Sequence, residues 1–112
     1  MNEMRPEDLS LDRLSPDELP RLALFIAGYL HQDLEVVHGS AARAAYDYAA
    51  EAELDELEEL AAEWEALRSL ARHVPIERIN DVLRQRFGSA WRAASREEID
   101  AVAREFELAL RE

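Results

Sequence analysis

The 112-residue chain contains no cysteine, no lysine and no threonine. Without cysteine it can form no disulfide bond, thiolate nucleophile or cysteine-ligated zinc site, which is consistent with a reducing compartment. The longest apolar run, Leu22–Leu30, is far shorter than the roughly 20 residues that a membrane-spanning helix needs. The N-terminus lacks the charged-then-apolar pattern of a signal peptide. We therefore expect a soluble, cytoplasmic protein with no contact to membranes.

Positive charge is also scarce, because 25 acidic residues face 13 arginines and the net charge is −12. The imbalance belongs to residues 1–65, which hold 17 acidic residues and 4 arginines, whereas residues 66–112 hold 8 and 9. Proteins that bind nucleic acid directly usually present a basic surface, so we do not expect that function. An acidic surface instead favours a basic protein partner, because complementary fields speed encounter.

The apolar residues recur at three- and four-residue spacing along most of the chain, which predicts amphipathic helices. The length fits one domain, and a chain of this size buries roughly 65% of its unfolded surface without metals or disulfides. We expect an all-α, single-domain bundle of about five helices over residues 15–112, preceded by a partly disordered N-terminal extension at residues 1–14. The predicted apolar stripes are Leu19, Leu22, Phe25, Ile26, Tyr29 and Leu30; Ala42, Ala45, Tyr46 and Ala49; Leu54, Leu57, Leu60, Ala61, Trp64, Leu67 and Ala71; Ile76, Ile79, Val82, Leu83 and Phe87; and Ile99, Val102, Ala103, Phe106 and Leu110.

Helix boundaries are marked by capping residues. Ser15-Pro16-Asp17-Glu18 predicts the first helix start, with Pro20 as the alternative first turn. Ser40 can cap the second helix, and Ser95–Glu98 has the pattern of a capping box. Gly88 fits a left-handed position at a helix C-terminus. Leu34–Val37 is the only candidate for a strand, and it is short.

The most distinctive stretch is Ala27-Gly28-Tyr29-Leu30-His31-Gln32-Asp33-Leu34, followed by a helix start at Gly39-Ser40. It resembles the small immunity proteins of bacterial contact-dependent growth inhibition systems, whose most recognisable element is a helix ending Gly-Ala-Tyr-Phe-His-Gln-Asp-Trp. The resemblance covers Pro20 to the C-terminus and is strongest over Leu22–Tyr48. It includes Arg86-Phe87-Gly88 followed by Trp91, where the family often has Phe-Gly or Leu-Gly and then an aromatic residue.

Two departures from the family pattern are visible. Leu34 stands where the family usually has Trp, and Ser89–Ser95 replaces the proline-rich turn common before the last helix. The resemblance implies a cytoplasmic protein that binds and blocks a cognate toxin domain delivered by a neighbouring cell. Because family members face different toxins, it does not identify this one.

A block of acidic residues without any base extends from Glu51 to Glu65. On a helix, several of its carboxylates fall opposite the leucine stripe, and charge patterning alone favours a solvated surface for them. The functional interpretation is an anionic surface that meets basic residues of a toxin, and in a nuclease the carboxylates would lie where phosphates bind. The candidate partner-binding carboxylates here are Asp55, Glu58, Glu59 and Glu63.

The His31-Gln32-Asp33 step allows three interpretations. Residues of these types usually form hydrogen bonds that end a helix, and this is our preferred explanation. Asp33 is also a candidate partner contact. A metal site made of His31, Asp33, Glu35 and His38 is disfavoured, because the spacing crosses a predicted helix break and contains no His-x-x-x-His pair. We expect no metal and no cofactor.

Two aromatic residues, Tyr48 and Trp91, are the best candidates for exposed binding anchors, since an exposed aromatic in a loop is a plausible hot spot. No phosphate loop, nucleophile elbow or Ser/His/Asp arrangement is present, so we do not expect an enzyme.

The resemblance, together with the acidic and helical sequence, implies a monomeric or weakly dimeric immunity protein that occludes a cognate toxin domain, with a basic nuclease as a candidate toxin. The alternative is a helical adaptor or regulatory protein that dimerises through the Leu54–Ala71 stripe. A third possibility, a metal-dependent hydrolase, requires His31 and His38 to converge.

Overall fold

The computed structural model describes residues 11, 13–31 and 34–111, and over these residues it is helical without any strand. Five helices have ten or more residues, and the short α3 is a single turn. The all-α, single-domain prediction is therefore confirmed, whereas the strand candidate at Leu34–Val37 is wrong. The helices are α2 (Pro20–Tyr29), α3 (Leu34–Val37), α4 (Ala41–Glu51), α5 (Leu54–Ala71), α6 (Ile76–Phe87) and α7 (Arg96–Leu110).

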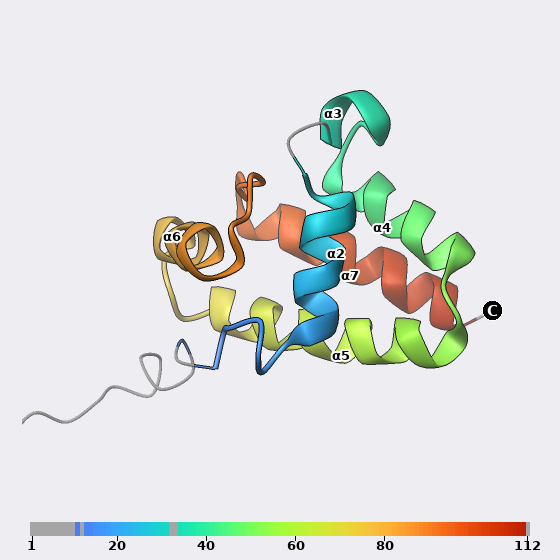
Figure 1. Ribbon diagram of the computed structural model, residues 1–112, viewed down its shortest axis with the longest axis horizontal. Helices are drawn as coiled ribbons and strands as arrows, with labels where there is room; N and C mark the ends of the chain where they lie inside the picture. The colour runs from blue at the N-terminus through green and yellow to red at the C-terminus, as the bar shows by residue number, and fades with distance from the viewer. Residues whose placement is uncertain (1–10, 12, 32–33, 112) are drawn as a thin grey trace, which may run out of the picture.

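Helix α7 is the central element, because it packs against both α4 and α5 (Figure 1). Helix α2 crosses the front of these helices and contacts α5 and α4, and α6 lies at the opposite end from the α4–α5 corner. Three rings meet edge to face at the centre: Phe25 lies 5.8 Å from Trp64 and 5.6 Å from Phe106 between ring centroids. Such pairs contribute about 0.5–1.5 kcal/mol each beyond the burial of their area. The Trp64 Nε1–H also donates to the carbonyl of Ile99 at 3.0 Å.

Two of the predicted helix boundaries are correct in detail. The Ser40 side chain accepts a hydrogen bond from the amide of Arg43 at 3.1 Å, and Gly88 ends α6 with φ of 64°. At the first helix, the alternative start at Pro20 is right and the start at Ser15 is wrong. Ser15 instead closes a turn, accepting from the amide of Glu18 at 3.4 Å.

The capping box at Ser95 is not formed, although α7 does begin at Arg96. The Ser95 side chain makes no capping hydrogen bond, and its carbonyl accepts from the Glu98 amide at 3.2 Å. The Glu98 carboxylate turns instead to the Trp91 ring, whose Nε1–H donates to it at 2.9 Å. Glu98 therefore binds the Trp91 side chain instead of the backbone at Ser95.

The predicted core stripes hold with a few exceptions. Leu54, at the first position of α5, is 65% exposed, and Tyr46 is exposed while Ala44 takes its place in the core. The core also extends into the predicted N-terminal extension, because Leu11 and Leu14 are buried. The Arg86 guanidinium donates to both of their carbonyls and fixes this segment against α6.

Candidate functional site

The acidic face of α5 divides into two groups, and the first group holds α2 in place. The Glu63 carboxylate accepts from the backbone amide of Leu22 at 2.8 Å. The Arg21 guanidinium donates to Glu59 at 2.9 Å and to Glu56 at 3.4 Å. Helix α2 has no acidic residue in its first turn and no side-chain cap of its own, so α5 supplies the negative charge that a helix N-terminus favours.

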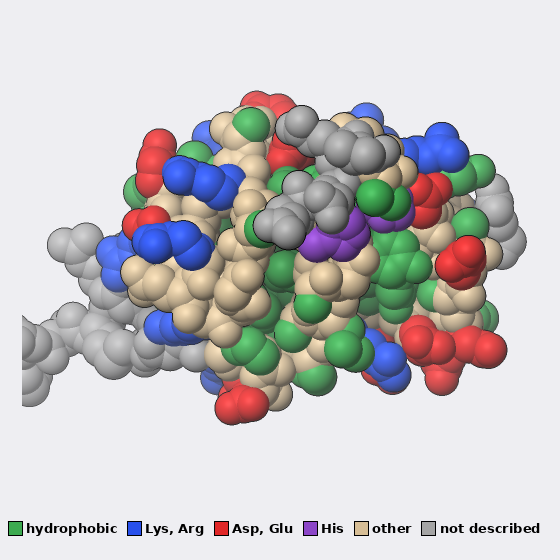
Figure 2. Space-filling view, turned by 45° about the horizontal axis from the view of Figure 1, so that its top comes forward, with side chains coloured by type: hydrophobic (Ala, Val, Ile, Leu, Met, Phe, Trp, Pro, Cys, Tyr) green, Lys and Arg blue, Asp and Glu red, His purple; other side chains and the backbone are tan. Residues whose placement is uncertain are grey.

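The second group of carboxylates does not hold α2, although Asp55 accepts from the Glu56 amide at 3.0 Å in the first turn of α5. Asp55 and Glu58 are exposed, as are Glu51 and Glu53 at the corner between α4 and α5. Glu58 forms no ion pair with the residues that the structure describes. In Figure 2 acidic side chains gather at the end of the molecule where α4 meets α5, and arginines gather over α6. The charge asymmetry of the sequence is therefore an asymmetry in space.

The expected exposure of Trp91 is wrong. Its side chain is 7% exposed, its Nε1–H bonds to Glu98, and its ring lies 6.1 Å from that of Trp64. The Ser89 hydroxyl bonds to both the amide and the carbonyl of Trp91, at 3.1 and 2.9 Å, and turns the ring inward. Trp91, which lies in the segment that precedes α7, is therefore part of the core.

Tyr48 is half-buried and contributes to the aromatic core. Its ring lies edge to face on Phe25 at 5.5 Å and on Tyr29 at 5.4 Å, and burial raises the pKa of its hydroxyl. The exposed tyrosine of α4 is Tyr46, with the Arg43 guanidinium 4.8 Å from its ring centroid. In a helix of mostly alanines the stripe is too weak to show which tyrosine faces inward.

A His–Asp pair that the sequence analysis missed follows the His31-Gln32-Asp33 step. The His38 Nδ1 lies 2.7 Å from Asp47 Oδ2, and it is the donor because an ionised carboxylate only accepts. The hydrogen bond from His38 is the main cause that lowers the pKa of Asp47, helped by Arg43. The His38 ring also stacks on Tyr29 at 5.4 Å. The pair therefore fixes the end of α3 to α4; Gln32 and Asp33 lie outside the described residues.

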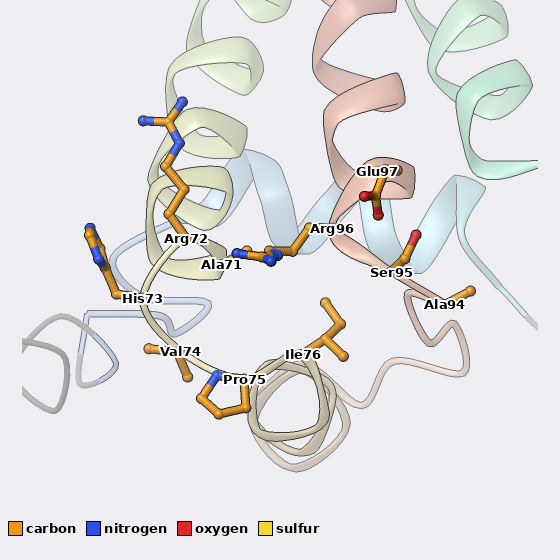
Figure 3. Close-up of a pocket in the computed structure, with 10 residues that line it drawn as sticks. All are labelled: Ala71, Arg72, His73, Val74, Pro75, Ile76, Ala94, Ser95, Arg96 and Glu97. Atoms are coloured by element: carbon orange, nitrogen blue, oxygen red, sulfur yellow. The ribbon is translucent and has the colours of Figure 1, made fainter.

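A surface pocket of about 460 Å³ lies between the α5–α6 turn and the start of α7 (Figure 3). Val74 and Ile76 form its apolar part, and the Arg96 side chain extends across it toward the end of α5. Arg72, His73 and Glu97 complete a rim of mixed charge. None of the candidate partner-binding residues predicted from the sequence lines this pocket.

Comparison with protein families gives a decisive match: a family described as CdiI immunity protein covers residues 18–106. The chain belongs to the CdiI immunity protein family. The match confirms the resemblance to immunity proteins of contact-dependent growth inhibition, and it extends from just before α2 to Phe106 in α7. Searches among curated proteins and among solved structures find no match.

Membership in the CdiI family implies that the protein binds and neutralises a cognate toxin, and immunity proteins of this kind are generally not enzymes. The part of the chain that the structure describes contains no helix long and apolar enough to cross a membrane. It also contains no group of three or more His, Asp or Glu side chains placed to hold a metal. Of the four disfavoured ligands, Asp33 and the side chain of Glu35 lie outside that part. The other two, His31 and His38, have ring centroids 6.3 Å apart.

Proposed function

We propose that this CdiI protein neutralises its toxin by covering it, without any chemical step, and that the toxin presents a basic surface. The observation that carries the proposal is the group of exposed carboxylates at the start of α5, Asp55 and Glu58, beside Glu51 and Glu53. Asp55 accepts a hydrogen bond from the Glu56 amide at 3.0 Å in the first turn of α5, and Glu58 forms no ion pair with the described residues. Neither carboxylate holds another helix, so both are available to bind basic side chains of a partner.

A nuclease is the kind of toxin that this surface fits best. An enzyme that cuts nucleic acid holds phosphates with arginine and lysine side chains. A row of carboxylates places negative charge at similar positions and keeps the substrate out of the groove. Long-range attraction would also raise the rate of encounter. The acidic surface thus supports both fast capture and occlusion.

The monomer is the expected active form. Dimerisation through the Leu54–Ala71 stripe needs that stripe on the surface, yet most of it is buried in the core of the same chain. Leu54 is the exposed exception, at the very start of α5. We therefore propose binding of one toxin domain by one chain.

Growth rescue tests this function. The C-terminal domain of the protein encoded immediately upstream is expressed from an inducible promoter, with or without this chain. We expect growth to stop without the chain and to continue with it. The control variant Phe25→Asp breaks the central ring cluster and should give no rescue. Continued toxicity in the presence of folded wild-type protein would refute the proposal.

A further inference from the structure

The outer face of α2 is an uncharged stripe on a highly charged molecule. Pro20, Leu24, Ala27 and Gly28 are all exposed and recur at intervals that place them on one side of the helix. Leu24 is 64% exposed. Such an uncharged surface stands out in a chain in which 34% of the residues are charged. The opposite face is the buried one, with Leu22, Phe25 and Ile26. Helices that are apolar on both sides are normally buried on both sides.

Gly28 is a second, independent observation on the same face. Its φ is not positive, unlike those of Gly39 and Gly88, and a Cβ at position 28 would meet no atom within 4 Å. Glycine inside a helix lowers stability relative to alanine. The fold therefore gives no reason for glycine at this position. A bare backbone on an exposed face allows close approach by another molecule.

We infer that the outer face of α2, defined by Pro20, Leu24, Ala27 and Gly28, is the apolar centre of the contact with the toxin. This inference rests on the proposed function and names the surface that performs it. At the N-terminal end of α2 the stripe is bordered by carboxylates of α5, since Arg21, next to Pro20, is held by Glu56 and Glu59. An apolar centre with a charged rim is the usual anatomy of a specific interface.

The acidic border selects a basic partner over a second copy of this chain. A dimer through α2 would bring together two copies that each carry a net charge of −12. Like charges across an interface disfavour association, whereas a basic toxin surface would be attracted. The figures show the two components together: α2 crosses the front of the bundle and acidic side chains gather beyond it toward the α4–α5 corner (Figures 1 and 2).

The test uses the full-length protein and the purified C-terminal domain of the protein encoded upstream. Leu24→Gln removes the exposed apolar side chain, and Gly28→Ala adds one methyl group. The matched control is Leu108→Gln, an exposed leucine on α7. We expect Leu24→Gln to raise Kd by about tenfold, the size of a typical hot-spot loss, and Leu108→Gln to leave Kd within about twofold.

Gly28→Ala separates binding from folding because the two readouts move in opposite directions. The melting temperature should rise by about 2–8 °C, since alanine is the better helix former. The affinity for the toxin domain should nevertheless fall by at least about threefold if the bare backbone is in contact. A purely structural role predicts the same rise in melting temperature with unchanged affinity.

The outcomes distinguish this inference from the proposed function. If wild-type protein neither binds the toxin domain nor rescues growth, the function itself is wrong. If it binds and all three variants bind equally well, the function stands and the α2 surface is overturned. A stable dimer of the free protein that Leu24→Gln dissociates would also overturn it, because a second copy would then occupy the surface.

Discussion

At the scale of single residues, the Glu63 carboxylate shows how a surface charge can serve the fold. Pro20 has no amide hydrogen, and the Ala23 amide bonds to the carbonyl of Leu19 at 3.1 Å. The Leu22 amide in the same turn is satisfied by Glu63 at 2.8 Å, from a different helix. A helix whose first-turn amides lack partners loses stability, so this side chain caps α2 from outside.

Replacing Glu63 by alanine should lower the free energy of unfolding by about 1–2 kcal/mol, as for the loss of a helix cap. Urea denaturation followed by circular dichroism measures the change. Glu58→Ala is the matched control, because Glu58 is exposed on the same helix, and it should stay within about 0.5 kcal/mol of wild type. Equal effects of the two substitutions would contradict the capping role.

The hydrogen bond between His38 and Asp47 predicts a pH-dependent contribution to stability. The bond lowers the pKa of Asp47, so the folded state holds this carboxylate ionised more strongly than the unfolded state does. The contribution is complete above the ordinary aspartate pKa of about 3.9 and is lost as the pH falls through the lowered value. The stability difference between wild type and Asp47→Asn, measured by urea denaturation, should therefore shrink from pH 5 toward pH 2. A constant difference would contradict this account.

At the scale of elements, Asn80 joins the segment before α7 to α6. It is buried, and its amide group both donates to the Ala93 carbonyl and accepts from the Ala93 amide, each at 2.9 Å. The Asn80 side chain thus satisfies both the N–H and the C=O of Ala93, as a neighbouring strand would. Ser89–Ser95 stands in place of the family's proline-rich turn, and the contact with Asn80 holds this segment in a fixed position.

Asn80→Ala should lower the free energy of unfolding by about 2–3 kcal/mol, since it leaves two buried backbone groups unpaired. Hydrogen exchange should show faster exchange of the Ala93 amide in particular. Gln85→Ala, an exposed position of the same helix, serves as the control and should do neither. Unchanged protection at Ala93 would contradict the role of Asn80.

The elements predictable from sequence are those with a strong apolar period. The α5, α6 and α7 stripes of leucine, isoleucine and aromatic residues fix both the helix and its buried face. The buried face of α4 is harder to predict, because its many alanines do not distinguish one face from the other. Tyr46, predicted to be buried, is exposed, and Tyr48, predicted to be exposed, is half-buried. The inward position of Trp91 depends on its packing against Trp64, and Glu98 is diverted from capping by its hydrogen bond to Trp91. The helix-start pattern at Ser95 contains no sign of either contact.

At the scale of the whole molecule, the candidate site was only partly visible in the sequence. The charge pattern located the acidic face of α5, but not its division into carboxylates that hold α2 and carboxylates that face solvent. That division depends on how α2 lies across α5, with Arg21 and Leu22 reaching Glu59 and Glu63. The uncharged outer face of α2 could not be predicted either, because the sequence does not show which side of this largely apolar helix is buried.

The exposed carboxylates predict the rate of toxin capture. Asp55→Asn with Glu58→Gln should lower the association rate constant by about three- to tenfold at low ionic strength and flatten its salt dependence. Stopped-flow measurement with the upstream toxin domain gives both quantities. The control Glu77→Gln with Glu97→Gln removes the same charge from exposed sites on α6 and α7 and should have a smaller effect. An unchanged rate constant in the first variant would refute electrostatic capture.

The central claim is that the protein acts by occupying its toxin, and a titration of toxin activity tests it most directly. A fixed amount of the purified toxin domain is mixed with increasing amounts of the wild-type protein, and the activity that remains is measured. The account predicts a linear fall to a minimum at one chain per toxin domain, independent of the time of mixing. Loss of activity that continues with time at far less than one equivalent would mean turnover and would contradict it.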